Sequence, residues 1–95
     1  NNAFGFAEEC GNRLGEDPSE PDSVFNKIND VFDWLPLAAV IEDRIVCLHG
    51  GIGSTLVSLD QIDAIQRPLE VIHEVSTVEQ QLVVDILWSD PTDSD

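Results

Sequence analysis

The residues with the clearest potential for chemistry are residues 49–53, which read His-Gly-Gly-Ile-Gly. They follow the short β-rich run 44–48, so His49 is expected at the carboxyl end of a strand, the edge where layered α/β folds place their sites. The glycines beside it allow a tight turn and the close approach of other groups. A histidine in this position is either a metal ligand or a packed, hydrogen-bonded residue, and these five residues alone leave both interpretations open.

A second candidate is the sequence Trp-Ser-Asp-Pro at residues 88–91. On residue types alone, Asp90 can simply open a turn after a helix, with Trp88 packed at the edge of the domain. His73 lies in a polar connection and is expected to face solvent. The sequence has no G-x-x-x-x-G-K-[ST] loop, no H-E-x-x-H or G-x-S-x-G motif and no cysteine zinc pattern. One histidine without a second ligand at short spacing cannot form a metal centre.

The chain carries 19 acidic against 4 basic residues, a formal net charge of -15. Such a chain repels phosphate backbones and anionic lipid surfaces, which argues against nucleic-acid and membrane partners. No apolar run approaches the ~20 residues needed to cross a bilayer. Cys10 and Cys47 lack C-x-x-C spacing, so we expect two buried, reduced thiols in an intracellular protein. With 95 residues and no initiator Met, we expect at most one small domain, cut from a longer chain.

The elements that must position these residues follow from apolar spacing and capping signals. We expect a β-hairpin of two nearly all-apolar strands in the middle of a larger fold that covers both faces, because the few helices of this chain cannot cover them. We also expect two late helices preceded by capping boxes, Ser58 with Gln61 and Ser76 with Glu79. The expected helices are 4–14, 24–35, one that ends before Pro68 and a last one with Val78, Leu82 and Ile86, and the expected strands are 37–41 and 44–48. These residues indicate part of an α/β domain with one histidine at a strand end.

Three blocks of the sequence occur in an informative order. Residues 4–10 read Phe-Gly-Phe-Ala-Glu-Glu-Cys, residues 35–51 run from Leu-Pro-Leu-Ala-Ala to His-Gly-Gly, and residues 87–91 read Leu-Trp-Ser-Asp-Pro. In this order and spacing they resemble the Tyr-Gly-Phe…Glu-Cys helix, the Leu-Pro-x-Ala-Ala…His-Gly-Gly block and the Leu-Trp-Ser-Asp-Pro box of the PPP family of serine/threonine protein phosphatases. The resemblance spans nearly the whole chain.

The resemblance implies an α/β fold in which this chain forms helices and a β-hairpin of a metallophosphoesterase β-sandwich flanked by helices. It implies hydrolysis of phosphoserine and phosphothreonine on proteins by two divalent or transition metal ions, manganese first, with iron or zinc as alternatives. His49 would be a ligand to one of these ions. Trp88, Asp90 and Phe4 would lie at the rim of the active-site cleft. Phe4 stands where many members carry Tyr, so the ring is kept and the hydroxyl is lost.

The family's Gly-Asp-x-His-Gly, Gly-Asp-x-x-Asp-Arg-Gly and Gly-Asn-His-Glu motifs are not in the sequence. Residues 1–95 are therefore expected to be the middle section of a single catalytic domain, with no further catalytic residue and no activity when isolated. His-Gly-Gly-Ile-Gly is most similar to the kelch-repeat phosphatases of plants and apicomplexan parasites. The expected partners are accordingly phosphoprotein substrates and regulatory proteins or an attached kelch propeller, in the cytoplasm or nucleus.

An alternative is an acidic binding or scaffolding module that keeps the phosphatase fold without its activity. A third reading is a phosphoesterase of the same fold that acts on small molecules or nucleotides, and the Leu-Trp-Ser-Asp-Pro box argues against it. The metal-binding motifs that precede such a segment in the family distinguish the first two interpretations.

Overall fold

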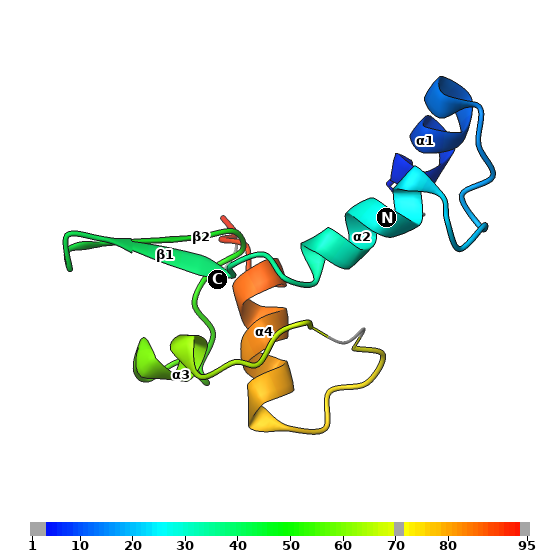
Figure 1. The fold of residues 1–95 in the computed structure, drawn as a ribbon. Helices are drawn as coiled ribbons and strands as arrows, with labels where there is room; N and C mark the ends of the chain where they lie inside the picture. Colours follow the sequence, from blue (N-terminus) through cyan, green and yellow to red (C-terminus); the bar gives the residue numbers. More distant parts are fainter. Residues whose placement is uncertain (1–3, 70–71, 94–95) are drawn as a thin grey trace. The chain divides into compact units, whose positions relative to one another are not determined.

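The computed structural model describes residues 4–69 and 72–93 (Figure 1). The chain divides into two compact units, Asn1–Leu35 and Pro36–Asp95. The first unit contains helices α1 (Phe6–Leu14) and α2 (Val24–Phe32). The second contains strands β1 (Ala38–Ile41) and β2 (Ile45–Leu48), the short helix α3 (Asp60–Asp63) and helix α4 (Val78–Trp88). The expected combination of helices with a β-hairpin is confirmed.

In the first unit, aromatic rings join the two helices. The ring centroid of Phe6 in α1 lies 5.5 Å from that of Phe25 and 6.1 Å from that of Phe32, both in α2. Tilted ring pairs at these separations are favourable. Helix α2 ends at Phe32, three residues before the expected end at Leu35. The physical reason is Pro36, which disfavours the helical conformation in the residue before it, so residues 33–35 form turns instead.

The loop before α2 caps that helix with two side chains. Ser23 is the N-cap, as expected, and its hydroxyl oxygen accepts a hydrogen bond from Asn26 N at 3.1 Å. The Glu16 carboxylate accepts from Val24 N at 2.7 Å and from Phe25 N at 3.2 Å. A negative charge is favourable at a helix N-terminus, where unpaired N–H groups concentrate. This loop was expected to be a plain solvent loop, and Glu16 ties it to the helix.

The two thiols have different surroundings. Cys10 in α1 is buried, and burial raises the pKa of its thiol above the ordinary value, with the nearby carboxylates of Glu16 and Glu9 acting in the same direction. Cys47 on β2 is exposed. The expectation of two buried thiols is therefore right for Cys10 and wrong for Cys47.

In the second unit, β1 and β2 form the expected antiparallel hairpin, with Val40 paired with Val46 at its centre. The turn is closed by a hydrogen bond from Arg44 N to the Ile41 carbonyl at 3.0 Å. Glu42 and Asp43 in this turn have φ values of 51° and 55°, the left-handed conformation that tight hairpin turns require. Both are polar residues, and the sequence placed the turn correctly at this polar trio.

Within the described residues the strands are not covered on both faces, as expected for this chain alone, and their covering by the rest of a larger fold stays a prediction. Val40 is 44% exposed, Ile41 49%, Ile45 55% and Val46 41%. The reason is that β1 and β2 pair only with each other in a two-stranded sheet. A two-stranded hairpin cannot bury both of its faces by itself.

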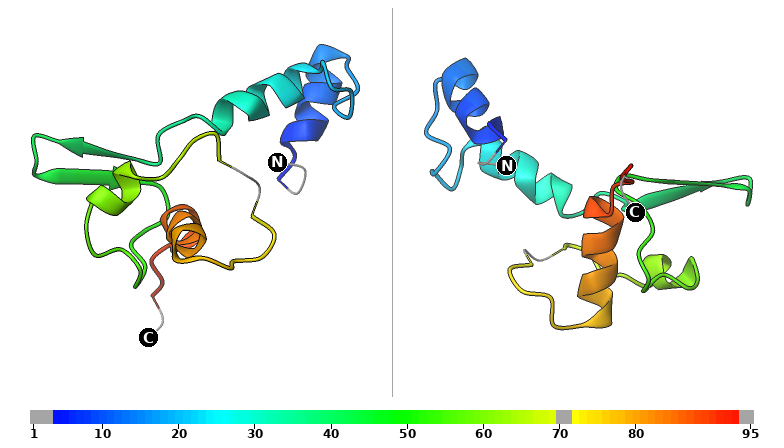
Figure 2. Two further views of the ribbon diagram at one scale, coloured as in Figure 1. Left: turned by 60° about the horizontal axis from the view of Figure 1, so that its bottom comes forward. Right: turned by 180° about the vertical axis from the view of Figure 1, so that it is seen from behind.

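The core of the second unit forms around α4, where Leu82, Val83 and Ile86 are buried together with Ile65. Partly buried apolar side chains surround this cluster: Leu37, Leu48, Leu56, Ile62, Leu69, Ile72 and Leu87. Leu37 and Leu48 lie at the base of the hairpin, whose tip extends away from α4 (Figures 1 and 2). The core thus holds the end of β2, where His49 follows.

The start of α4 is capped one residue later than the sequence predicted. Thr77, not Ser76, is the N-cap, and its side chain accepts a hydrogen bond from Gln80 N at 3.1 Å. Gln80, not Glu79, completes the capping arrangement, since its side-chain oxygen accepts from Ser76 N at 2.8 Å. At α3, Gln61 accepts from Ser58 N at 2.9 Å, so one half of the expected box is present.

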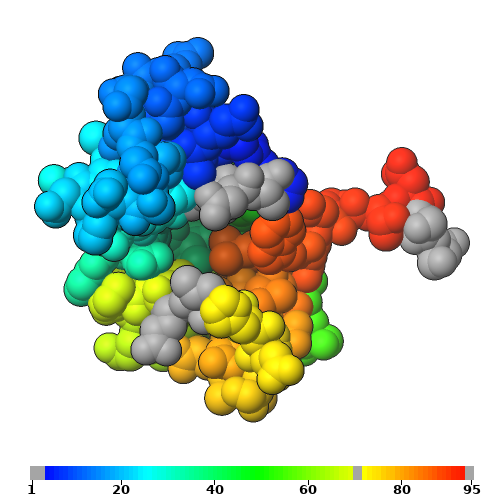
Figure 3. Space-filling model, turned by 90° about the vertical axis from the view of Figure 1, so that its right-hand side faces the viewer, coloured from blue at the N-terminus to red at the C-terminus, as the bar shows by residue number. Residues whose placement is uncertain are grey.

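After α4 the described chain continues to Asp93, and this tail stands out from the rest of the second unit in the space-filling view (Figure 3). Asp90 and the residues from there to Asp93 are exposed. Within the described ranges, the helices are all too short or too polar to cross a membrane.

Candidate metal-ligand loop at the end of β2

Residues 49–53 leave β2 and pack directly against the last turn of α4. Gly50 is buried, and its N–H donates a hydrogen bond to the Ile86 carbonyl at 2.6 Å. A Cβ atom placed on Gly50 would lie 2.6 Å from Trp88 N and 2.7 Å from the Leu87 carbonyl carbon. Side chains do not tolerate such distances to backbone atoms, so the contact requires glycine at this position.

The other two glycines of the loop face the same helical turn. A Cβ on Gly51 would overlap with the Ser89 carbonyl oxygen, and a Cβ on Gly53 would overlap with the Asp85 carboxylate. Among the described glycines, positive φ values occur at Gly5 and Gly15 and not in this loop. The glycines of His-Gly-Gly-Ile-Gly are therefore needed for close approach to α4 and not for a left-handed turn.

Asp85 makes the side-chain link between this helix and the chain just after the loop. Its carboxylate accepts a hydrogen bond from the Thr55 hydroxyl at 3.2 Å and another from Gln81 Nε2 at 2.7 Å. Its backbone carbonyl accepts from Ser89 N at 2.9 Å, which closes the end of α4. Neither Asp85 nor Thr55 was singled out from the sequence. The available signal was an acidic residue at position 85 inside the apolar run 82–87.

Of the four residues predicted for the site, the structure brings the chain next to His49 close to the backbone of Trp88. His49 precedes the glycine that contacts the backbone of Trp88, and Asp90 follows two residues later. The side chains of His49 and Asp90 are exposed, and Trp88 is 65% exposed. Phe4 belongs to the first unit, where it is 83% exposed, and its place relative to His49 is not defined. His73 is exposed, as expected.

The sequence matches a known protein family over almost its whole length. Residues 5–95 match the calcineurin-like phosphoesterase family. The chain belongs to this family. It is 45% identical over 95 residues to the serine/threonine-protein phosphatase BSL2 of Arabidopsis thaliana, and the match covers 100% of this chain and 9% of that protein. No solved structure gives a significant match.

The predicted relationship to the PPP phosphatases and the predicted fold class are thereby confirmed. A calcineurin-like phosphoesterase is a metallophosphoesterase, so the family implies divalent metal ions. A neutral imidazole is a suitable ligand for the transition metals among such ions. Among the described residues, however, no three His, Cys, Asp or Glu side chains gather closely enough to hold an ion. The prediction that His49 is a metal ligand therefore stays a prediction.

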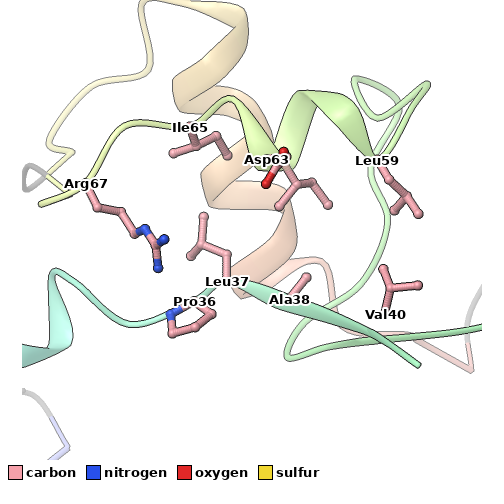
Figure 4. Close-up of a pocket in the computed structure, with 9 residues that line it drawn as sticks. Pro36, Leu37, Ala38, Val40, Leu59, Asp63, Ile65 and Arg67 are labelled. Carbon is pink, nitrogen blue, oxygen red and sulfur yellow. The ribbon is translucent and has the colours of Figure 1, made fainter. Parts of the chain in front are cut away.

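One hollow of this phosphoesterase segment lies away from the candidate site. Its volume is about 290 Å³, and Figure 4 shows it between β1 and the α3 region, with apolar side chains such as Leu37, Val40 and Leu59 around it and Arg67 extending toward Pro36. None of the residues predicted for the site lines it. It gives no reason to move the candidate site away from the end of β2.

Proposed function

We propose that this chain is the middle section of a catalytic domain that removes phosphate from phosphoserine and phosphothreonine in proteins, and that His49 is one ligand of a two-metal site. The observation that carries the proposal is the bond from Gly50 N to the Ile86 carbonyl. It holds the His-Gly-Gly block against the residue that precedes the Leu-Trp-Ser-Asp-Pro block, and the His49 side chain is exposed. A metal ligand needs a fixed position, which this backbone contact helps to supply, and an imidazole that an ion can reach.

Each residue of this segment then has a limited role. His49 supplies one nitrogen donor from a strand end that the unit's core holds in place. Trp88 and Asp90 form part of the rim of the cleft, where an exposed indole and an exposed carboxylate can contact a protein substrate. The proposal that Phe4 is also a rim residue rests on the family resemblance alone. The proposed ions are manganese, with iron or zinc as alternatives. When bound, they would polarise the phosphoryl group and lower the pKa of a water ligand.

The remaining ligands must come from other segments of the protein, because one donor cannot hold an ion alone. The chain spans 9% of the plant relative, which leaves ample sequence for them. The hairpin supports this arrangement, since four of its apolar side chains (Val40, Ile41, Ile45 and Val46) are more than 40% exposed in this segment. Neighbouring strands and helices of a larger sandwich would cover them.

The similarity to a plant phosphatase and the sequence His-Gly-Gly-Ile-Gly support the kelch-repeat subgroup of the family. The partners proposed on that basis are phosphoprotein substrates together with regulatory proteins or an attached kelch propeller. The net charge of -15 makes direct binding to nucleic acid or to an anionic membrane unfavourable. The proposed location is the cytoplasm, the nucleus or both.

The proposal is tested with the complete catalytic domain and with residues 1–95 alone, each given manganese and then an excess of chelator. The complete domain should dephosphorylate phosphoserine and phosphothreonine peptides, and chelator should stop the reaction. The isolated residues should not hydrolyse p-nitrophenyl phosphate. If the complete domain binds proteins but shows no turnover with any of the three metals, the chain is part of an acidic binding module and the proposed activity is wrong.

A further inference from the structure

We infer that Asp85 is a positioning residue for His49, acting through Thr55 to hold the loop 49–55 against α4. The inference rests on the proposed function of His49 as a ligand. Its structural basis is that the loop is attached to α4 at two points. Gly50 N is bonded to the Ile86 carbonyl, and the Thr55 hydroxyl is bonded to the Asp85 carboxylate at 3.2 Å.

The two attachments involve consecutive residues of one helical turn, Asp85 and Ile86. Between them the chain passes over Asp85, since the carboxylate lies directly against Gly53, where no Cβ would fit. A loop that is held at both ends has fewer conformations than a loop held at one end. The backbone of His49, which is next to the first attachment, is thus fixed relative to α4.

The identity of residue 85 supports a role beyond that of the helix itself. Asp is a poor helix former, and a carboxylate near the C-terminal end of a helix is unfavourable because the last carbonyl groups carry partial negative charge. Residue 85 lies in the last turn of α4 and is half-buried. Within the helix, the bond from Gln81 offsets part of this cost. The bond from Thr55 and the contact with Gly53 give a reason for the carboxylate that lies outside the helix.

The hydrogen bonds of Asp85 can be removed separately, which allows a matched comparison in the complete catalytic domain. Thr55→Val removes the bond that reaches the loop, at nearly constant side-chain volume. Gln81→Leu removes the other bond, which lies within α4 and does not reach the loop. Thr55→Ser keeps a hydroxyl donor and serves as the conservative variant. Asp85→Ala removes both bonds while improving helix propensity.

Two quantities are measured for each variant: amide hydrogen exchange of residues 50–53 in metal-free protein, and affinity for Mn²⁺ by titration calorimetry. Thr55→Val and Asp85→Ala should speed loop exchange and weaken Mn²⁺ binding by about tenfold, the lower end of what loss of an outer contact to a metal site causes. Gln81→Leu should change neither by more than about twofold. Thr55→Ser should keep the loop exchange rates and the Mn²⁺ affinity near their wild-type values.

The inference is overturned if Thr55→Val leaves loop exchange and Mn²⁺ affinity unchanged, or if Thr55→Ser is as defective as Thr55→Val. It is also overturned if Gln81→Leu has the same effect as Thr55→Val, because Asp85 would then act only on the helix. If the wild-type domain binds no Mn²⁺, the proposed function fails. The exchange comparison still decides in that case whether Asp85 holds the loop.

Discussion

Replacing Gly50 by alanine should destabilise the protein far more than one added methyl group ordinarily does. The added Cβ would lie 2.6 Å from Trp88 N and 2.8 Å from the Ile86 carbonyl oxygen. Ordinary contacts begin at 3.4 Å, so the loop and the end of α4 must separate by roughly 0.8 Å. Both sides of the contact are backbone, so neither can yield by a side-chain rotation.

The magnitude follows from two contributions. Overpacking of this kind costs typically about 1–3 kcal/mol, and a weakened bond from Gly50 N to the Ile86 carbonyl costs about 0.5–1.5 kcal/mol more. Gly50→Ala should therefore lower the free energy of unfolding of the complete domain by about 2–4 kcal/mol. This is a large fraction of the stability of an ordinary domain.

Gly11→Ala in α1 is the matched control for this substitution. Its Cβ would lie 3.5 Å from the Glu16 carbonyl oxygen and 3.6 Å from Pro18 Cγ, both ordinary contacts. Alanine is a better helix former than glycine by about 0.5–1 kcal/mol, so this variant should be unchanged or slightly more stable. Urea unfolding of both variants provides the comparison. A Gly50→Ala protein within 0.5 kcal/mol of wild type, about the size of an ordinary surface effect, would refute the packing described for this loop.

Three further predictions concern the two cysteines and Asp17 in the loop before α2. In the folded chain, a thiol reagent should modify exposed Cys47 quickly and buried Cys10 slowly, and equal rates would contradict the burial of Cys10. Because the pKa of Cys10 is raised, the folded state favours the protonated thiol. The contribution of the Cys10 thiol to folding stability is complete below its ordinary pKa of 9.0 and is lost as the pH rises through the raised value. Unfolding titrations of wild type and Cys10→Ala at alkaline pH should reveal this loss. The hydroxyl and N–H of Ser19 donate hydrogen bonds that hold the pKa of Asp17 below its ordinary value of 3.8. The contribution of the Asp17 carboxylate to folding stability is therefore present above pH 3.8 and is lost as the pH falls through the lowered pKa. Ser19→Ala should move the Asp17 pKa upward in a carboxyl NMR titration, and an unmoved value would show that the hydroxyl bond has no effect.

The sequence predicted the features that depend on neighbouring residues. The apolar spacing of α2 and the alternation of two apolar runs around a polar trio gave a helix and a hairpin close to their observed bounds. The ends were less accurate where adjacent residues compete for one role. Thr77 and Ser76 can both cap a helix, and only the observed partner, Gln80, shows which one does.

Features that depend on contacts between distant segments were not predicted. The glycines of residues 49–53 indicated a close approach, but nothing in the sequence named α4 as the element that approaches. Asp85 and Thr55 carry no local motif, and their bond becomes visible only when the loop and helix are placed together.

The central claim, that His49 is a metal ligand, is tested most directly by counting metal ions in His49→Asn, with His73→Asn as the control. Both histidines are exposed, and asparagine keeps a polar side chain at each position. In the complete domain, His49→Asn should retain the wild-type melting temperature when both proteins are metal-free, and it should lose tight binding at one of two metal sites. Its kcat should be lower by a factor of about 10²–10³, or about 3–4 kcal/mol of transition-state stabilisation. His73→Asn should bind the full number of ions and keep its activity. A His49→Asn protein with two tightly bound ions and near-normal kcat would contradict the assignment.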